Sequence, residues 1–106
     1  MEFKVNNSDP DEIGEYCSAL SNSAALIGEQ YGYLVFGVQD KDVSIVGATF
    51  DPKTTKVGNH ELENWLATQL EPRIDFEILP VNFEGKSLVI FRIDATKQRP
   101  VAFKGK

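Results

Sequence analysis

Residues 31–38, Tyr-Gly-Tyr-Leu-Val-Phe-Gly-Val, form an unbroken run of apolar, aromatic and β-branched side chains punctuated by glycine. A run of this length and composition is typical of a central strand that is covered on both faces. Its two glycines predict positions where another part of the backbone approaches closely. The polar tetrad at 39–42 predicts a turn, and residues 43–47 predict the returning partner strand of a first hairpin.

The N-terminal segment predicts a strand followed by a helix. Polar and apolar residues alternate at the start of the chain, so Phe3 and Val5 are expected to face the core. Asp9 followed by Pro10 is typical of a helix N-terminus, and Gly28 is a plausible stop. Apolar residues recur at helical spacing and predict the buried face of this helix: Ile13, Tyr16, Cys17, Leu20, Ala24 and Ile27.

The second half of the chain predicts one more helix and three strands. Asn59 is expected to cap a helix that ends before Pro72, with an apolar stripe of Leu62, Trp65, Leu66 and Leu70. Residues 76–83 and 88–93 predict two strands joined by a tight turn at Glu84-Gly85, and residues 101–103 predict a short edge strand. The fold class is therefore α+β: one domain with a mixed, mostly antiparallel sheet and two helices, in the order β-α-β-β-α-β-β-β.

Composition is that of a folded intracellular domain. The chain has 106 residues, of which 42% are hydrophobic and 25% charged, so one modest core is expected. The single cysteine, Cys17, excludes an internal disulfide and a cysteine-rich zinc site, and its predicted role is packing. No apolar run reaches the roughly 20 residues that a membrane span needs. We expect a cytoplasmic protein with no membrane partner.

Charge is distributed unevenly along the chain. The net charge is −5, but residues 1–85 carry −10 and residues 86–106 carry +5. Clustered basic side chains are the usual requirement for binding phosphates. The predicted nucleic-acid-binding residues are Lys97, Arg99, Lys104 and Lys106, with Lys4, Lys86 and Arg92 as further contributors if they share the same face. The alternative is that these charges only keep edge strands soluble.

Four short motifs occur in an order that resembles a known family. They are Glu2-Phe3-Lys4, residues 16–22 (Tyr-Cys-Ser-Ala-Leu-Ser-Asn), residues 33–40 (Tyr-Leu-Val-Phe-Gly-Val-Gln-Asp), and Arg99-Pro100 before residues 103–106 (Phe-Lys-Gly-Lys). Together they resemble the Schlafen AlbA-type domain, which has also been filed as a divergent ATPase-like family. The resemblance implies a DNA-binding domain spanning residues 1–106, the N-terminal module of a longer bacterial protein of the transcriptional-regulator kind, with DNA favoured over RNA.

The same resemblance raises an enzymatic alternative. Some Schlafen proteins cut RNA with clustered carboxylates, and the matching positions here are Glu2 and Asp40. Such carboxylates could hold a divalent metal that activates water. The nuclease members carry a further glutamate upstream of the first motif, for which this sequence has no room before Met1. We therefore expect a protein that is not an enzyme and assign no catalytic residue, no metal ligand and no cofactor.

Other enzymatic readings have little support in the sequence. No Gly-x-x-x-x-Gly-Lys-Ser/Thr stretch is present for binding the phosphates of ATP. The only histidine, His60, is expected to be a solvated surface residue.

A third alternative is an interaction module. The predicted edge strand at 101–103 could extend the sheet of a second copy, giving a homodimer. Tyr31, Tyr33 and Trp65 could contribute an apolar patch, although their positions in the apolar pattern favour the core.

Overall fold

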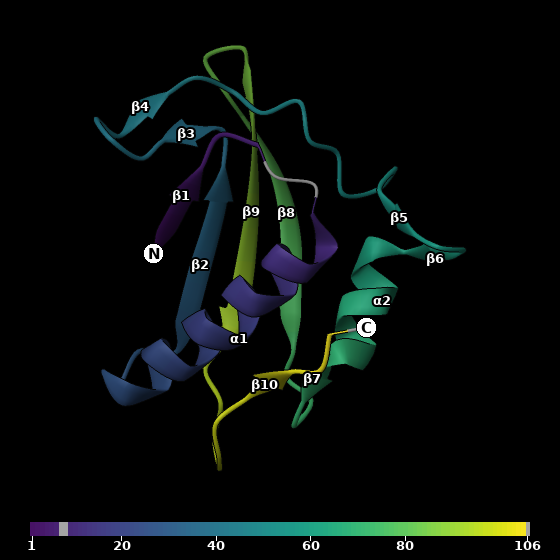
Figure 1. Cartoon of the computed structure of the whole chain (residues 1–106). Helices are drawn as coiled ribbons and strands as arrows, with labels where there is room; N and C mark the ends of the chain where they lie inside the picture. The colour runs from purple at the N-terminus through teal and green to yellow at the C-terminus, as the bar shows by residue number, and fades with distance from the viewer. Residues whose placement is uncertain (7–8, 106) are drawn as a thin grey trace.

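The chain builds a four-stranded sheet with two helices, seen in a computed structural model that describes residues 1–6 and 9–105 (Figure 1). The strand order is β1-β2-β9-β8. Strand β1 (Glu2–Lys4) runs parallel to β2 (Tyr31–Phe36), whereas β9 (Lys86–Asp94) is antiparallel to both β2 and β8 (Phe76–Phe83). The predicted α+β class with a mostly antiparallel sheet is confirmed.

Strand β2 lies inside the sheet as predicted, but the predicted first hairpin forms only beyond the end of this strand. Its antiparallel neighbour is β9, and residues 43–47 contribute only to a small separate ribbon of β3 (Val38–Gln39) and β4 (Ser44–Ile45). The reason is Gly37, whose φ of +104° turns the chain out of the sheet after Phe36. The long strand β9 then pairs with all six residues of β2.

Helix α1 (Pro10–Leu26) begins where the sequence predicts. The Asp9 side chain accepts a hydrogen bond from the Asp11 backbone N–H at 3.1 Å, the expected cap. The predicted burial of Ile27 is wrong, because Ile27 is the C-cap and is 73% exposed. A Cβ at Gly32 would lie 2.7 Å from the Leu20 carbonyl oxygen, so this glycine allows α1 to approach β2 closely, as predicted.

Helix α2 (Leu62–Gln69) starts later than predicted. Its N-cap is Glu61, without a side-chain capping bond, and Asn59 lies instead in the turn between β5 (Lys56–Val57) and β6 (His60–Glu61). The Leu62 N–H donates to the Thr55 carbonyl at 3.1 Å, so a backbone contact takes the place of the predicted cap. After α2, β7 (Leu70–Glu71) pairs with β10 (Ala102–Phe103).

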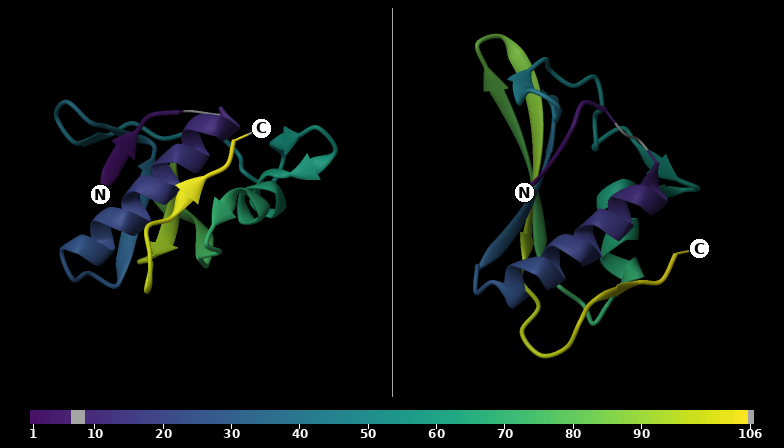
Figure 2. Two further views of the ribbon diagram at one scale, coloured as in Figure 1. Left: turned by 60° about the horizontal axis from the view of Figure 1, so that its bottom comes forward. Right: turned by 60° about the vertical axis from the view of Figure 1, so that its left-hand side comes forward.

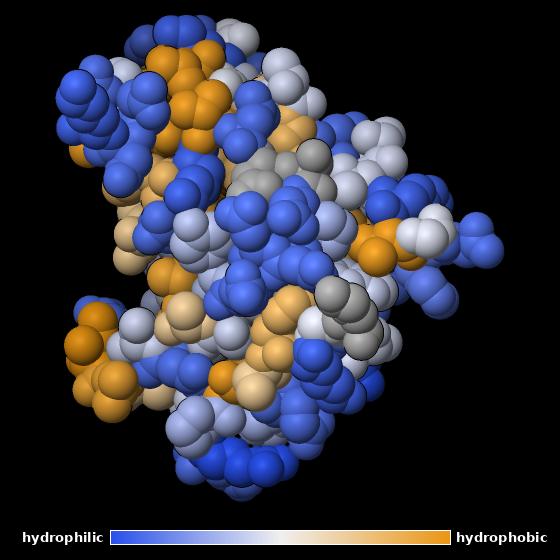
Figure 3. Space-filling view, viewed as in Figure 1, coloured by the Kyte–Doolittle hydropathy of each residue, from blue (hydrophilic) through white to orange (hydrophobic). Residues whose placement is uncertain are grey.

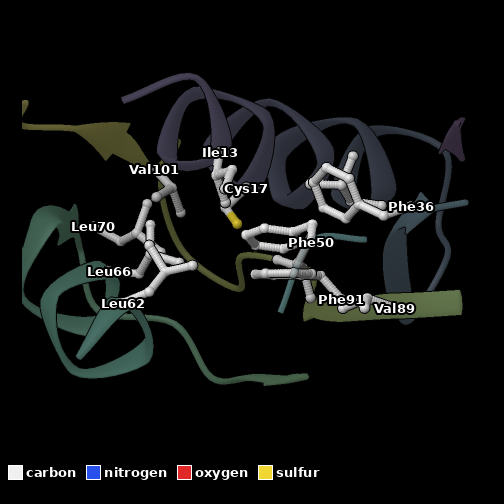
Figure 4. Packing of buried hydrophobic residues seen from close by; sticks show 12 residues of the cluster. Ile13, Cys17, Phe36, Phe50, Leu62, Leu66, Leu70, Val89, Phe91 and Val101 are labelled. Atoms are coloured by element: carbon white, nitrogen blue, oxygen red, sulfur yellow. The ribbon is translucent and has the colours of Figure 1, made fainter. Parts of the chain in front are cut away.

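Both helices lie on one face of the sheet, and the core fills the space between (Figures 2 and 4). The Phe36 ring packs against Phe50 at 4.9 Å and Phe91 at 5.8 Å between centroids. Trp65 is half-buried and packs on Phe103. The sheet residues of the core come from this face alone: Leu34, Phe36, Val89, Phe91 and Ile93.

The opposite face of the sheet, hereafter the outer face, carries neither of the two helices that the described residues form (Figure 2). Phe3 lies beside Val35 in the parallel register, and neighbours in register point to the same side. Val35 alternates with the core residues Leu34 and Phe36, so Phe3 and Val35 are on the outer face. The prediction that Phe3 faces the core is therefore wrong, and Val5 lies beyond the end of β1. The predicted cover on both faces of residues 31–38 holds only in part, because no described helix lies on the outer face although Val35 is only 7% exposed.

No helix among the described residues is long and apolar enough to span a membrane.

Cys17 has the packing role that the sequence predicts, and its burial leads to a test. It is fully buried, and desolvation raises the pKa of its thiol to about 12. Thiol reagents need the thiolate, so they should modify Cys17 only in molecules that have opened. We expect labelling to be negligible in native buffer, monitored by mass spectrometry, and to become complete on adding urea. Rapid native labelling would contradict the buried position.

The raised pKa of Cys17 also predicts a pH dependence. The folded state holds the thiol proton more tightly than the unfolded state, where the pKa is about 8.5. The contribution of the protonated thiol to the unfolding free energy is therefore fully present below about pH 8.5. It is lost as the pH rises towards 12, by up to about 1.4 kcal/mol per pH unit. The difference in unfolding free energy between the wild-type chain and Cys17→Ala should shrink over that range.

Candidate nucleic-acid interface

The predicted basic residues Lys97 and Arg99 lie in the loop between β9 and β10, at one end of the sheet. The start of this loop is fixed by the Ala95 N–H, which donates to the Gln30 carbonyl at 3.0 Å. Its far end is fixed by the pairing of β10 with β7 and by the Lys104 N–H, which donates to the Gln69 carbonyl at 2.8 Å. The backbone that carries these cations is therefore held in place on both sides.

Two polar side chains of α1 hold the same loop. The Asn22 amide donates to the Val101 carbonyl at 2.9 Å, and its oxygen accepts from the Val101 N–H at 2.7 Å. The buried Ser21 hydroxyl donates to the Asp94 carbonyl at 2.7 Å. Sequence reasoning missed both roles. The available signal was the position of Ser21, a polar residue one turn after the buried Cys17, since a buried polar group requires a partner.

A small hollow of about 220 Å³ brings Lys97 together with a cation that sequence reasoning missed. It is lined by residues 72–75 and 94–98, and both Arg73 and Lys97 contribute to its wall. The two segments are joined by the Asp94 N–H, which donates to the Asp75 carbonyl at 3.0 Å. Arg73 was missed because the charge argument compared segments of the sequence, and Arg73 belongs to the acidic one.

Arg99 follows Lys97 by two residues in the same loop and is already paired. Its guanidinium donates to the Glu71 carboxylate at 3.1 Å, and the two side chains are 64% and 55% exposed. An exposed pair of this kind contributes little to stability, so a phosphate could replace the carboxylate at small cost. Lys104 is exposed at the end of β10. Lys106 lies outside the described residues.

The further contributors named from the sequence lie elsewhere. Arg92 is on the outer face, paired with Glu77 and 4.7 Å from the Tyr31 ring centroid. Lys86 donates to the Ile45 carbonyl at 3.2 Å, at the opposite end of β9 from Lys97. A nine-residue strand is roughly 30 Å long, so the basic segment of the sequence does not form one surface.

Acidic side chains accompany the basic ones at this end of the sheet. Asp75 and Asp94 line the same hollow as Arg73 and Lys97. With Glu71 beside Arg99, the local charge is close to balanced. We define the basic cluster as Arg73, Lys97 and Arg99, and expect any binding to phosphate there to be weak and sensitive to salt.

A larger hollow of about 510 Å³ lies between the loop at 48–53, the start of α2 and strands β8 and β9. Its apolar wall includes Phe50 and Ile78. The charged residues of its lining are three acids and one base: Asp51, Glu61, Glu63 and Lys53. Because three carboxylates and one lysine are the charged residues of this lining, its negative charge would repel a phosphate group.

The two carboxylates of the enzymatic alternative belong to Glu2, on β1, and Asp40, which follows β3. Glu2 lies 3.8 Å from the Lys4 ammonium, which is 5.0 Å from the Tyr16 ring centroid. The hydrogen bond with Tyr16 is the main cause that raises the pKa of Lys4, so this ammonium stays charged. Asp40 is exposed in the turn after β3. Within residues 1–6 and 9–105, no three His, Cys, Asp or Glu side chains gather closely enough to hold a metal ion.

Comparisons with known proteins identify a family and a fold. The family model described as Schlafen, AlbA_2 matches residues 1–106, the whole chain. Among solved structures, the DIP2311 protein from Corynebacterium diphtheriae is similar, with a TM-score of 0.61 and 17% sequence identity. The match covers 98% of this chain and 16% of that chain, and at this identity it shows the fold alone. No curated protein matches the sequence.

Proposed function

We propose that this chain, which belongs to the Schlafen AlbA_2 family, is a nucleic-acid-binding domain that contacts the phosphate backbone through its basic cluster. The observation that carries the proposal is that Lys97 and Arg73, from segments far apart in the sequence, line one hollow. Arg99, in the same loop as Lys97, pairs with Glu71 next to Pro72 of this lining, and a phosphate can displace that exposed carboxylate. Arginine can hold a phosphate with two donors, whereas lysine supplies a mobile point charge.

The finer parts of the proposal concern the ligand and the parent protein. Contacts of this kind position a backbone without reading its bases, so binding is expected to depend little on sequence. DNA is proposed as the preferred ligand over RNA, and binding rather than catalysis as the role. The proposed setting is a cytoplasmic bacterial protein of the transcriptional-regulator kind.

Salt dependence is the first expected result. If the three side chains of the basic cluster each neutralise one phosphate of duplex DNA, the logarithm of the affinity should fall against the logarithm of the salt concentration with a slope of about −2.7. A fourfold rise in salt would then weaken binding roughly 40-fold. Fluorescence anisotropy of labelled duplex DNA, single-stranded DNA and structured RNA, with and without magnesium, measures this directly.

Charge reversal identifies the surface. The triple variant Arg73→Glu/Lys97→Glu/Arg99→Glu is expected to lose binding. The matched control is Lys41→Glu/Lys53→Glu/Lys56→Glu, which reverses three exposed lysines elsewhere and changes the net charge equally. The control should keep most of the affinity. Equal losses in both variants, or no binding of the wild-type chain at low salt, would reject this site, and magnesium-dependent cleavage would instead favour the nuclease alternative.

A further inference from the structure

The outer face of the sheet is apolar across all four strands. Phe3 on β1, Val35 on β2, Ile90 on β9 and Leu79 on β8 are neighbours in register and form one transverse row. Leu88 and Val81 form the next row. An antiparallel sheet that faces water usually alternates apolar residues on its core face with polar ones outside. Here the outer positions in these two rows are apolar as well.

Several of these side chains remain accessible to solvent. Val81 is 40% exposed and Phe83, at the end of the same strand, is 46% exposed. Leu79, Leu88 and Ile90 are half-buried. Within residues 1–6 and 9–105 no helix lies over this face, since α1 and α2 pack on the other side (Figure 2). The helix side, by contrast, shows mostly hydrophilic atoms with separate apolar patches (Figure 3). An extended apolar face of this kind usually marks an interaction surface.

One pair of opposite charges lies beside the apolar row. Arg92 and Glu77 are neighbours in register on β9 and β8, and they pair with each other. A surface that carries both signs side by side is complementary to a copy of itself turned by a two-fold rotation, because each cation can then face the anion of the other copy. A phosphate backbone would instead favour an excess of cations, whereas Arg92 on this face is paired with Glu77.

The geometry favours contact through the face over contact through an edge. Strand β8 is at the edge of the sheet, and Pro80 stands in the middle of it. A proline at such a position discourages the addition of another strand. With strands about 4.8 Å apart and β9 roughly 30 Å long, covering the outer faces of two copies would remove on the order of 1,000 Å² from water. That area is near the lower limit for a specific interface.

We propose that two copies of this chain pack their outer faces together and form a two-fold dimer. Its centre is the row of Phe3, Val35, Ile90 and Leu79, with Arg92 of each copy next to Glu77 of the other. Two sheets packed in this way lie about 10 Å apart. This contact differs from the edge extension at residues 101–103 considered from the sequence, and it leaves the basic cluster uninvolved, so it can fail without affecting the proposed nucleic-acid site.

Sedimentation equilibrium of the 106-residue chain, from low to high micromolar concentration, tests the dimer. The apparent mass should rise from that of a monomer to twice that value. Val81→Lys and Leu79→Lys should remain monomeric at every concentration. Leu26→Lys is the matched control, because Leu26 is 86% exposed on α1, and it should dimerise like the wild-type chain. Circular dichroism at low concentration checks that each variant is folded.

A charge-swap mixture separates contacts between copies from those within one copy. Arg92→Glu places two acidic side chains next to each other at positions 77 and 92, and Glu77→Arg places two basic side chains there. Each variant alone should therefore dimerise at least tenfold more weakly than the wild-type chain. Mixing the two should restore dimers with one copy of each variant, detected by native mass spectrometry. The proposal would be overturned by a wild-type chain that is monomeric throughout, by dimers that survive Val81→Lys and Leu79→Lys, or by a mixture that stays monomeric.

Discussion

Replacement of Leu66 by alanine is expected to lower the free energy of unfolding by about 2–5 kcal/mol. Leu66 is fully buried and belongs to the core together with Leu62 and Leu70. Helix α2 has only eight residues, and helices shorter than about 12 residues are marginal on their own. The helix therefore depends on this packing for its existence. A domain of this size has roughly 5–15 kcal/mol of stability in total, so the variant should be close to unfolding.

Leu26→Ala is the control for Leu66→Ala. Both residues are helical leucines, but Leu26 is 86% exposed and Leu66 is 0% exposed. The control should change the unfolding free energy by no more than about 0.5 kcal/mol. Urea denaturation at low protein concentration, followed by circular dichroism, measures the unfolding free energy of both variants. Similar shifts in the two variants would show that α2 does not pack against the core as described.

Gly37→Ala is the second change with a large expected effect, because Gly37 joins three parts of the chain. Its N–H donates to the Lys4 carbonyl at 2.8 Å and is 3.0 Å from the Val5 carbonyl, at the end of β1. Its own carbonyl accepts from the N–H groups of Val46 and Gly47, both at 2.9 Å. The strand β2 thus ends at a residue whose backbone connects β1 to the segment after β4.

Two separate costs add up at Gly37. Its φ of +104° is a conformation that residues with a side chain rarely adopt, which costs about 1–3 kcal/mol. A Cβ would also lie 2.6 Å from a Leu88 methyl group and 2.9 Å from the Ser87 carbonyl oxygen, and crowding of this kind costs about 1–3 kcal/mol more. We therefore expect Gly37→Ala to lower the unfolding free energy by roughly 2–6 kcal/mol in total.

Gly58→Ala separates the two costs. Gly58 also has a positive φ, +62°, but a Cβ there meets no atom within 4 Å. Only the backbone cost applies, about 1 kcal/mol. Thermal and urea unfolding of both variants should show the larger loss at Gly37, together with weakened amide protection at Val46 and Gly47 in hydrogen exchange. A Gly37→Ala variant no less stable than Gly58→Ala would contradict the junction described here.

The sequence predicted the helices and the long strands because their signals are local. The Asp9 cap and Pro10 were sufficient to locate the start of α1, and the turn at Glu84-Gly85 was sufficient to locate the hairpin of β8 and β9. Asn59 shows the limit of such signals. It is a good capping residue by type, but the backbone bond from Leu62 to Thr55 starts the helix without it.

The candidate site was predicted only in part, since its residues come from separate segments. Lys97 and Arg99 were named from the excess of positive charge after residue 85, and they do lie close together in one loop. Arg73 could not be predicted, because it reaches Lys97 only through the contact between the segments after β7 and β9. Arg92 and Lys86 share the same stretch of sequence but lie on another face and at the other end of the sheet.

The sequence by itself determined the class of fold, the two helices, the long hairpin and the excess of positive charge near its end. Each of these depends on side-chain periodicity, capping and turn residues within a few positions of one another. Only the tertiary structure decided that β9 pairs with β2, that Phe3 faces away from the core, and that Arg73 joins the basic cluster. Strand partners, the buried face and the meeting of distant charges depend on register and on packing across long loops, which no local pattern specifies.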